Sequence, residues 1–150
     1  MTKIKQGEKA PYFEAEDQSG KKITIDDFKG RKIVLFFYPK DDTPGCTKQA
    51  CNLRDNYAAM QKAGYEVLGI SNDPVKSHEK FRNKYSLPFS LLADTEKKMV
   101  NDYGVYGEKS FMGKKYMGII RTTFVIDEDQ KIEKIISDIK TGDHTNQILK

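Results

Sequence analysis

The sequence predicts an α/β protein, in which helices flank both faces of one mixed β-sheet and an N-terminal β-hairpin precedes them. Two apolar runs, at residues 32–38 and 66–71, have the length and composition of buried strands. A helical pattern follows each run, at 44–62 and 73–85. Because crossover helices join parallel strands and terminal hairpins add antiparallel ones, the sheet should be mixed.

The first thirty residues contain two short alternating segments, around residues 12–15 and 22–25. The polar turn at 17–20 lies between them, which is typical of a β-hairpin. Residues 26–30 then turn the chain into the buried strand at 32–38.

The central part of the chain alternates helices and strands. The helix that follows the first buried strand should run to about Lys62, because Gly64 supplies a C-terminal stop. Asp73-Pro74 opens the next helix, and Pro88 forces the turn after it. The remaining elements here are an extended segment at 89–93 and a helix from 94 to about 103, which Gly104 ends.

The last third of the chain begins with a glycine-rich and aromatic stretch at 104–118, which we expect to be a long irregular loop and therefore functional. Two strands at 122–126 and 131–136 follow, joined by a polar turn, and a short helix occupies 145–150. No repeat or linker divides the sequence, so residues 1–150 should form a single domain.

Composition excludes several classes of function. A net charge of +4 is spread over 26 basic and 22 acidic residues, with no basic block long enough to bind nucleic acid. There is no signal-peptide pattern and no window apolar enough to cross a membrane, so we expect a cytoplasmic protein without a membrane partner. In a reducing compartment, two cysteines are more often catalytic than structural.

One of these cysteines falls where a buried strand gives way to a helix. Pro39 ends the strand, since it has no N–H to donate to the sheet. Thr43 and Pro44 are typical of the N-cap and first position of a helix, which puts Cys46 in its first turn. Free backbone N–H groups and the helix dipole favour a thiolate there, so Cys46 should be reactive.

The second cysteine, Cys51, lies five residues further along the same helix. In an unbroken helix the two Cα atoms would be roughly 8.5 Å apart. A disulfide needs Cα atoms closer than about 7 Å. The two cysteines can therefore bond only if the first turns of the helix unwind.

The pattern Pro39-x-x-x-Thr43-x-x-Cys46 resembles the active-site motif of the peroxiredoxins, which are thiol peroxidases. The second cysteine five residues on resembles the Q-type branch, also called bacterioferritin comigratory proteins. The likeness extends over nearly the whole chain, through Gly113-Lys114 and Arg121 to the strand at 123–127. It implies a thioredoxin-like fold and a peroxidase activity.

The resemblance also implies roles for individual residues. Cys46 would be the peroxidatic cysteine, which becomes a sulfenic acid, and Cys51 the resolving cysteine of the same chain. Arg121 would stabilise the thiolate and the developing oxyanion. The hydroxyl of Thr43 would contact the thiolate and the peroxide. Pro39 would complete the catalytic set by shaping the loop, and three supporting residues would surround it: Pro44, Gly45 and Gln49, the last oriented toward the arginine.

Each of these residues also has an ordinary structural explanation. Cys46 and Cys51 could be small core residues, and Thr43 could serve only as an N-cap. An arginine at a strand start is usually a solvated charge, and a helical glutamine such as Gln49 is often exposed.

The expected substrate is hydrogen peroxide or an alkyl hydroperoxide, and the expected reductant is thioredoxin or a similar dithiol. The resemblance implies a monomer that needs no metal, haem or flavin cofactor. Neither His78 nor His144 has flanking residues typical of a cysteine hydrolase, and a zinc site built from both cysteines and both histidines does not fit the usual ligand spacing.

Two alternative functions remain open at this point. A thiol–disulfide oxidoreductase would use the same fold, but normally with two residues between its cysteines, where this chain has four. A non-enzymatic redox sensor would keep the reactive thiol and turn over slowly. Peroxide-dependent consumption of reduced thioredoxin separates the three functions.

Overall fold

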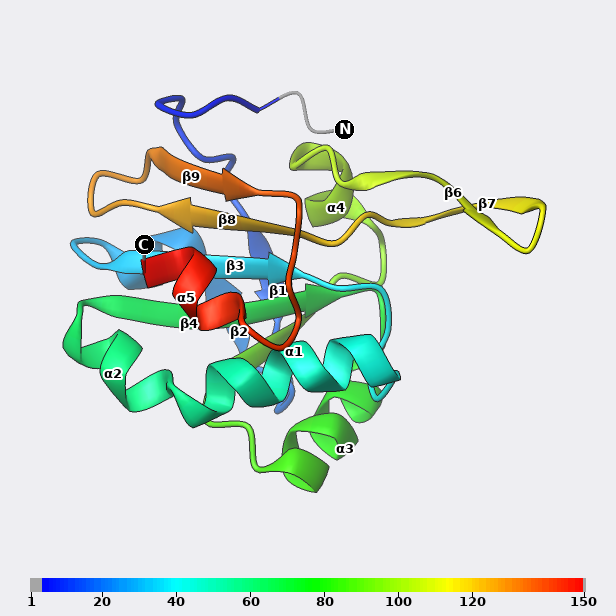
Figure 1. The fold of residues 1–150 in the computed structure, drawn as a ribbon. Helices are drawn as coiled ribbons and strands as arrows, with labels where there is room; N and C mark the ends of the chain where they lie inside the picture. Colours follow the sequence, from blue (N-terminus) through cyan, green and yellow to red (C-terminus); the bar gives the residue numbers. More distant parts are fainter. Residues whose placement is uncertain (1–3, 150) are drawn as a thin grey trace.

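A seven-stranded mixed sheet runs through the centre of the computed structural model, which describes residues 4–149 (Figure 1). The strand order is β2-β1-β5-β4-β3-β8-β9. β3 pairs in parallel with β4, and β4 with β5, whereas the other pairs are antiparallel. The strands are β1 Glu14–Glu16, β2 Lys22–Thr24, β3 Lys32–Phe37, β4 Tyr65–Ser71, β5 Ser90–Ala93, β8 Thr122–Ile126 and β9 Ile132–Ile136.

The central strand β3 divides the core into two halves. Because side chains alternate along a strand, Leu35 and Phe37 enter one cluster while Val34 and Phe36 enter the other. Residues of α1, α2, α3 and α5 complete the second cluster, and residues of α4 and a 3₁₀ helix complete the first. These elements are the 3₁₀ helix Ile25–Phe28, α1 Pro44–Asp55, α2 Tyr57–Lys62, α3 Val75–Tyr85, α4 Lys98–Asp102 and α5 His144–Leu149.

The predicted mixed sheet with helices on both faces is therefore confirmed, as are the N-terminal hairpin and the strands at both ends of the chain. In the hairpin Ala15 lies opposite Ile23, and the carboxylate of Asp17 accepts hydrogen bonds from the backbone of Ser19 and Lys21. Among residues 4–149 no helix has the length and apolar character that a membrane span requires. Lys150, the predicted end of the last helix, lies outside the described residues.

The single helix predicted to run from 44 to 62 is wrong, because the structure has two helices there, α1 and α2, separated at Asn56. The side-chain Nδ2 of Asn56 donates to the carbonyl of Asn52 at 2.8 Å. The backbone N–H of Asn56 donates to the carbonyl of Leu53 at 3.3 Å, a contact tighter in sequence than the helical bond to Asn52. An asparagine side chain thus competes with the helical hydrogen bond and separates α1 from α2.

The stretch at 104–118, predicted as an irregular loop, is a two-stranded antiparallel ribbon of β6 (Tyr106–Phe111) and β7 (Lys114–Ile119). Its turn places Met112 and Gly113 at φ of 52° and 81°. Two consecutive positive φ values suit a tight hairpin turn, but methionine is not a residue that signals one. Figure 1 shows the ribbon extending away from the main sheet.

The helix predicted from residue 94 begins only at Lys98. The buried carboxylate of Asp94 accepts hydrogen bonds from the backbone N–H groups of Met99 and Val100, at 3.1 and 2.9 Å. Asp94 therefore stabilises the start of the helix without being its first residue, because the carboxylate reaches forward to N–H groups that lack a helical partner.

Candidate active site

The candidate site lies at the end of β3, where the loop at 38–43 leads into α1. Thr43 occupies the N-cap position and Pro44 the first helical position, as the sequence predicts. Cys46 follows in the first turn, with a side chain that is 1% exposed. Its sulfur therefore lies at the positive end of a twelve-residue helix, where backbone N–H groups have no helical partner.

Arg121 reaches the same point from a distant part of the sequence. It directly precedes β8, whose antiparallel pairing with β3 puts Thr122 opposite Phe37, next to the loop. The guanidinium Nη2 donates to the sulfur of Cys46 at 3.3 Å. The predicted pair of arginine and cysteine is thus brought together by the register of two strands.

Gln49 orients this arginine. Its Oε1 accepts a hydrogen bond from Nη1 of Arg121 at 2.7 Å, while Nη2 points to the sulfur. Gln49 is fully buried, so it is not the exposed helical glutamine of the alternative interpretation. With one N–H held by an amide oxygen, the planar guanidinium has a fixed direction toward Cys46.

Gly45 leaves room for that contact. A Cβ atom at this position would lie 3.2 Å from Nη2 of Arg121, which is tighter than almost all such contacts. A side chain here would push the guanidinium away from the sulfur, so the glycine allows the arginine to approach the helix start.

Two further residues of the loop at 38–43, Thr43 and Pro39, were predicted to belong to the site. The hydroxyl of Thr43 donates to the carbonyl of Lys40 at 2.9 Å instead of capping the helix with its side chain. Its only proton is therefore committed, and toward the sulfur or a peroxide it can act only as an acceptor. Pro39 lines a groove of about 370 Å³ between the loop and the β6–β7 ribbon.

Cys51 lies in the same unbroken helix and is partly exposed, and neither cysteine forms a disulfide. The helix spans both cysteines, from Pro44 to Asp55, so the sulfur atoms cannot bond in this conformation. The structure thus represents the reduced, folded state of the pair.

Lys109, from the ribbon, is a site residue that the sequence analysis missed. Its Nζ donates to the carbonyl of Ile119 at 2.8 Å. Burial lowers the pKa of Lys109, and the positive charge of Arg121 lowers it further, while Cys46 has the opposite influence. No sequence signal identified this lysine, because the stretch that carries it was expected to be a loop.

Both histidines are fully buried, which the sequence analysis also missed. His144 lies near the site, where its Nδ1 contacts Oε1 of Gln147 and its Nε2 contacts the hydroxyl of Thr123, both at 2.8 Å. Oε1 of Gln147 also accepts from the backbone of Lys140, so it is an acceptor and Nδ1 carries the proton. In the neutral ring, Nε2 would then carry no proton and would accept a hydrogen bond from the hydroxyl of Thr123.

Burial lowers the pKa of His144 below its usual 6.5, and the charge of Arg121 adds to this effect. Because the unfolded chain binds this proton more readily, the free energy of unfolding should fall as the pH drops below about 6.5. Replacing His144 with glutamine should make this fall shallower between about pH 6.5 and 5. Urea unfolding at several pH values measures both slopes, and equal slopes in the two proteins would contradict the expectation.

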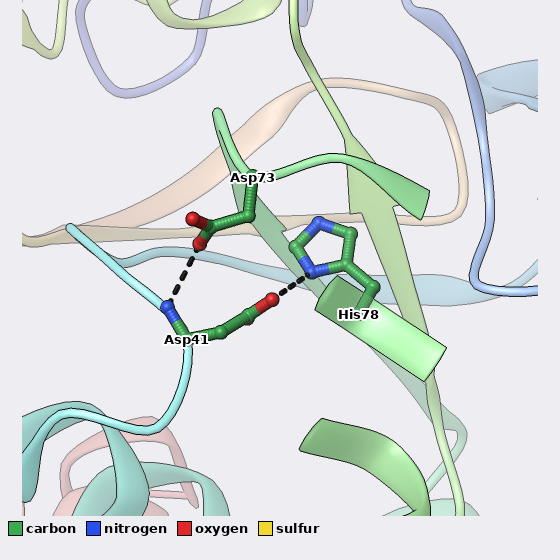
Figure 2. Close-up of side chains that lie close together, drawn as sticks. All are labelled: Asp41, Asp73 and His78. Atoms are coloured by element: carbon green, nitrogen blue, oxygen red, sulfur yellow. Dashed lines mark hydrogen bonds and ion pairs between the residues drawn. The ribbon is translucent and has the colours of Figure 1, made fainter. Parts of the chain in front are cut away.

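One cluster of possible metal ligands occurs among residues 4–149, and it consists of Asp41, Asp73 and His78 (Figure 2). Their ligand atoms lie within 4.8 Å of one another. Figure 2 shows Asp41 pointing directly at His78, and Asp73 accepting the backbone N–H of Asp41. Nδ1 of His78 is already bonded to Asp41, and Oδ2 of Asp73 accepts from the backbone of Asp41 and the hydroxyl of Ser71, so these atoms are committed to bonds within the protein.

Comparisons with known proteins agree with this geometry. The sequence matches the AhpC/TSA family over residues 6–135. It is 48% identical to a putative peroxiredoxin bcp of Coxiella burnetii over 146 residues, which cover 97% of each chain. It is 47% identical to peroxiredoxin Bcp of Escherichia coli K12, with 99% of this chain and 96% of that one covered.

Solved structures of similar proteins have the same fold. Peroxidoxin BcpB of Mycobacterium tuberculosis superposes with a TM-score of 0.86 at 35% identity, with 97% of this chain and 94% of that one covered. PrxQ of Xylella fastidiosa superposes with a TM-score of 0.93 at 26% identity, over 99% and 95% of the two chains.

A thioredoxin-like sheet with a buried cysteine at a helix start, held against an arginine, defines a thiol-based peroxidase. The family match and the relatives at about 47% identity agree with this class. The chain belongs to the AhpC/TSA family, and its relatives are the Bcp and Q-type peroxiredoxins that its cysteine motif resembles.

Proposed function

We propose that Cys46 is the peroxidatic residue of this thiol-dependent peroxidase, with hydrogen peroxide or an alkyl hydroperoxide as substrate. The contact between Arg121 and the buried sulfur of Cys46, at 3.3 Å, is the observation that supports this assignment best. The thiolate attacks one peroxide oxygen, the O–O bond breaks, and the other oxygen leaves as water or alcohol after taking a proton. The sulfur is thereby oxidised to a sulfenic acid.

Arg121 assists the reaction with peroxide both before and during the attack of the thiolate. Its permanent charge favours the thiolate before the attack, and its N–H groups can donate to the oxygen that becomes negative as the O–O bond breaks. Gln49 holds the guanidinium in the required direction through its 2.7 Å hydrogen bond. Thr43, whose hydroxyl proton is bonded to Lys40, can accept a hydrogen bond from the peroxide O–H.

We further propose that Cys51 resolves the sulfenic acid within the same chain. Its thiolate attacks the sulfur of Cys46, a disulfide forms, and the sulfenic oxygen leaves as water. This step requires residues 44–51 to leave the helical conformation, since an intact α1 keeps the two sulfurs apart.

Contacts at Asn52 favour unwinding that stops directly after Cys51. The Oδ1 of Asn52 accepts hydrogen bonds from the backbone and hydroxyl of Thr145, at 2.9 and 2.8 Å, and Nδ2 donates to the carbonyl of Gly142 at 3.1 Å. These bonds attach the helix to the C-terminal segment. The part between Thr43 and Asn52 can therefore change conformation while the rest of α1 stays in place.

A dithiol protein such as thioredoxin would reduce the Cys46–Cys51 disulfide and complete the cycle. Intrachain resolution needs no second subunit, so we propose a single-domain monomer that works in a reducing compartment such as the cytoplasm. The sulfur carries the redox chemistry in every step.

Intact mass measurement tests the roles of both cysteines. After one equivalent of hydrogen peroxide, the reduced wild type should lose two hydrogens, and Cys51→Ser should instead gain one oxygen. Cys46→Ser is the matched control, and its mass should not change on the same timescale.

Each other outcome is informative. A disulfide between two chains would contradict intrachain resolution while leaving the peroxidatic role of Cys46 intact. Oxidation of Cys51 in the Cys46→Ser variant, as fast as in the wild type, would contradict the assignment of the two roles.

A further inference from the structure

A buried contact between a carboxylate and an imidazole involves the active-site loop at 38–43. His78, in α3, is fully buried, and the side chain of Asp41, in the loop, is 4% exposed. Their closest atoms, Nδ1 and Oδ2, are 2.7 Å apart (Figure 2). The loop between β3 and α1 is thus tied to α3 through these two side chains.

The partners of His78 determine how many protons this contact holds. Nε2 lies 2.9 Å from the carbonyl oxygen of Leu92, which can only accept, so Nε2 carries a proton. If Nδ1 were bare and Asp41 ionised, two lone pairs would face each other at 2.7 Å, which is repulsive. One proton must therefore lie between Nδ1 and Oδ2.

The other partners of Asp41 place that proton on the imidazole. The hydroxyl of Tyr38 donates to Oδ1 at 2.6 Å, and the hydroxyl of Ser77 donates to Oδ2 at 2.8 Å. A carboxylate that accepts several hydrogen bonds is stabilised in its ionised form. Asp41 is then an anion, and His78 an imidazolium that donates from both nitrogens.

The surrounding titratable groups fit this charge state. Asp73 faces the loop from the segment between β4 and α3, and its Oδ2 accepts the backbone N–H of Asp41 at 2.8 Å. Tyr38 faces the pair from the end of β3, and burial together with the charge of Asp41 raises the pKa of its hydroxyl, which keeps it a donor. One cation thus lies among groups that are negative or neutral.

We propose that His78 is a positioning residue of the peroxidase, and that its imidazolium fixes the active-site loop by binding the carboxylate of Asp41. The proposal rests on the function assigned to Cys46 above. Asp41 lies two residues after Pro39 and two before Thr43, so a fixed Asp41 sets the path of the loop and the direction in which α1 begins. Cys46 and its contact with Arg121 depend on that direction.

A second tie between the loop and α3 is exposed and therefore weaker. Asp42 accepts hydrogen bonds from Lys84 and from the hydroxyl of Tyr85, both at 2.8 Å. Solvent screens such pairs, whereas the contact of His78 is shielded from water. The chain thus offers a matched comparison between an exposed and a buried tie on neighbouring residues.

Nitrogen NMR of protein labelled in its histidine rings tests the charge assignment directly, because the chain contains only two histidines. At neutral pH both ring nitrogens of His78 should give the signal of a protonated nitrogen. His144 is the internal control, and it should have one protonated and one bare nitrogen. A bare Nδ1 in His78 would overturn the proposal.

Peroxide kinetics test the positioning role. His78→Gln should lower the rate constant for oxidation of Cys46 by hydrogen peroxide by about 10- to 100-fold, because the loop that positions the sulfur is no longer fixed. Lys84→Met, which removes the cation of the exposed tie, should change it by less than about twofold. An unchanged His144 spectrum in each variant would establish that the fold is retained.

The pH profile separates positioning from a general loss of stability. In the wild type, the rate constant should fall at alkaline pH in parallel with loss of the His78 imidazolium signal, and His78→Gln should lack this fall. A wild-type rate that stays constant while the signal disappears would overturn the proposal. If the wild type did not react with peroxide at all, the proposed function would fail, whereas the NMR result would still report the charge of His78.

Discussion

Arg121→Met should lower the second-order rate constant for oxidation of Cys46 by hydrogen peroxide by about 10²–10³-fold. Methionine is of similar length but has neither charge nor N–H groups. It therefore removes the donor that lies 3.3 Å from the sulfur, together with the charge that favours the thiolate. The rate constant can be measured by competition with a peroxidase of known rate, because the chain contains no tryptophan to report the reaction by fluorescence.

Two further variants make this result specific. Arg121→Lys keeps the charge but cannot donate to Gln49 and Cys46 at once, so its rate constant should lie between those of the wild type and Arg121→Met. Arg31→Met, which removes the partner of Glu66 far from the loop, is the control and should react like the wild type. Equal rates in the wild type and Arg121→Met would contradict the proposed role.

Gly69→Val should destabilise the protein by at least about 1–3 kcal/mol, the usual cost of forcing extra methyl groups into a packed core. Gly69 lies in the middle of β4, where a Cβ atom would be 2.7 Å from Phe36 and 2.8 Å from Leu91. Both neighbours are fully buried in adjacent strands, so neither can move without disturbing the sheet.

Urea unfolding measures this loss as a lower midpoint. Gly69→Ala should lie between the wild type and Gly69→Val, because it adds one methyl group instead of three carbon atoms. The order of the three stabilities tests the prediction as well as the size of the loss does. A valine variant as stable as the wild type would mean that β3 and β5 can separate from β4 without loss of stability.

The sequence alone predicted the elements whose signals are local. The apolar run at 32–38 became β3, because such a run is stable only with both faces buried. Thr43 and Pro44 started the helix where predicted, which placed Cys46 in its first turn. The impossibility of a Cys46–Cys51 bond within an intact helix also followed from spacing alone.

Local sequence signals did not predict two features of the fold, the break in the long helix and the β6–β7 turn. Asn56 interrupts the long helix through a bond of its own side chain to Asn52, although its sequence position is compatible with a helix. The β6–β7 turn places Met112 at a positive φ, which methionine rarely adopts, so nothing in the sequence indicated a ribbon there.

The tertiary structure alone decided which distant residues meet. Arg121 reaches Cys46 because β8 pairs with β3 in one register, and a shift of one residue would turn its side chain to the opposite face of the sheet. His78 and Asp41 meet because α3 packs beside the loop at the end of β3. A sequence read locally carries spacing and periodicity, whereas these contacts depend on strand register and on helix packing between segments that lie 37 and 75 residues apart.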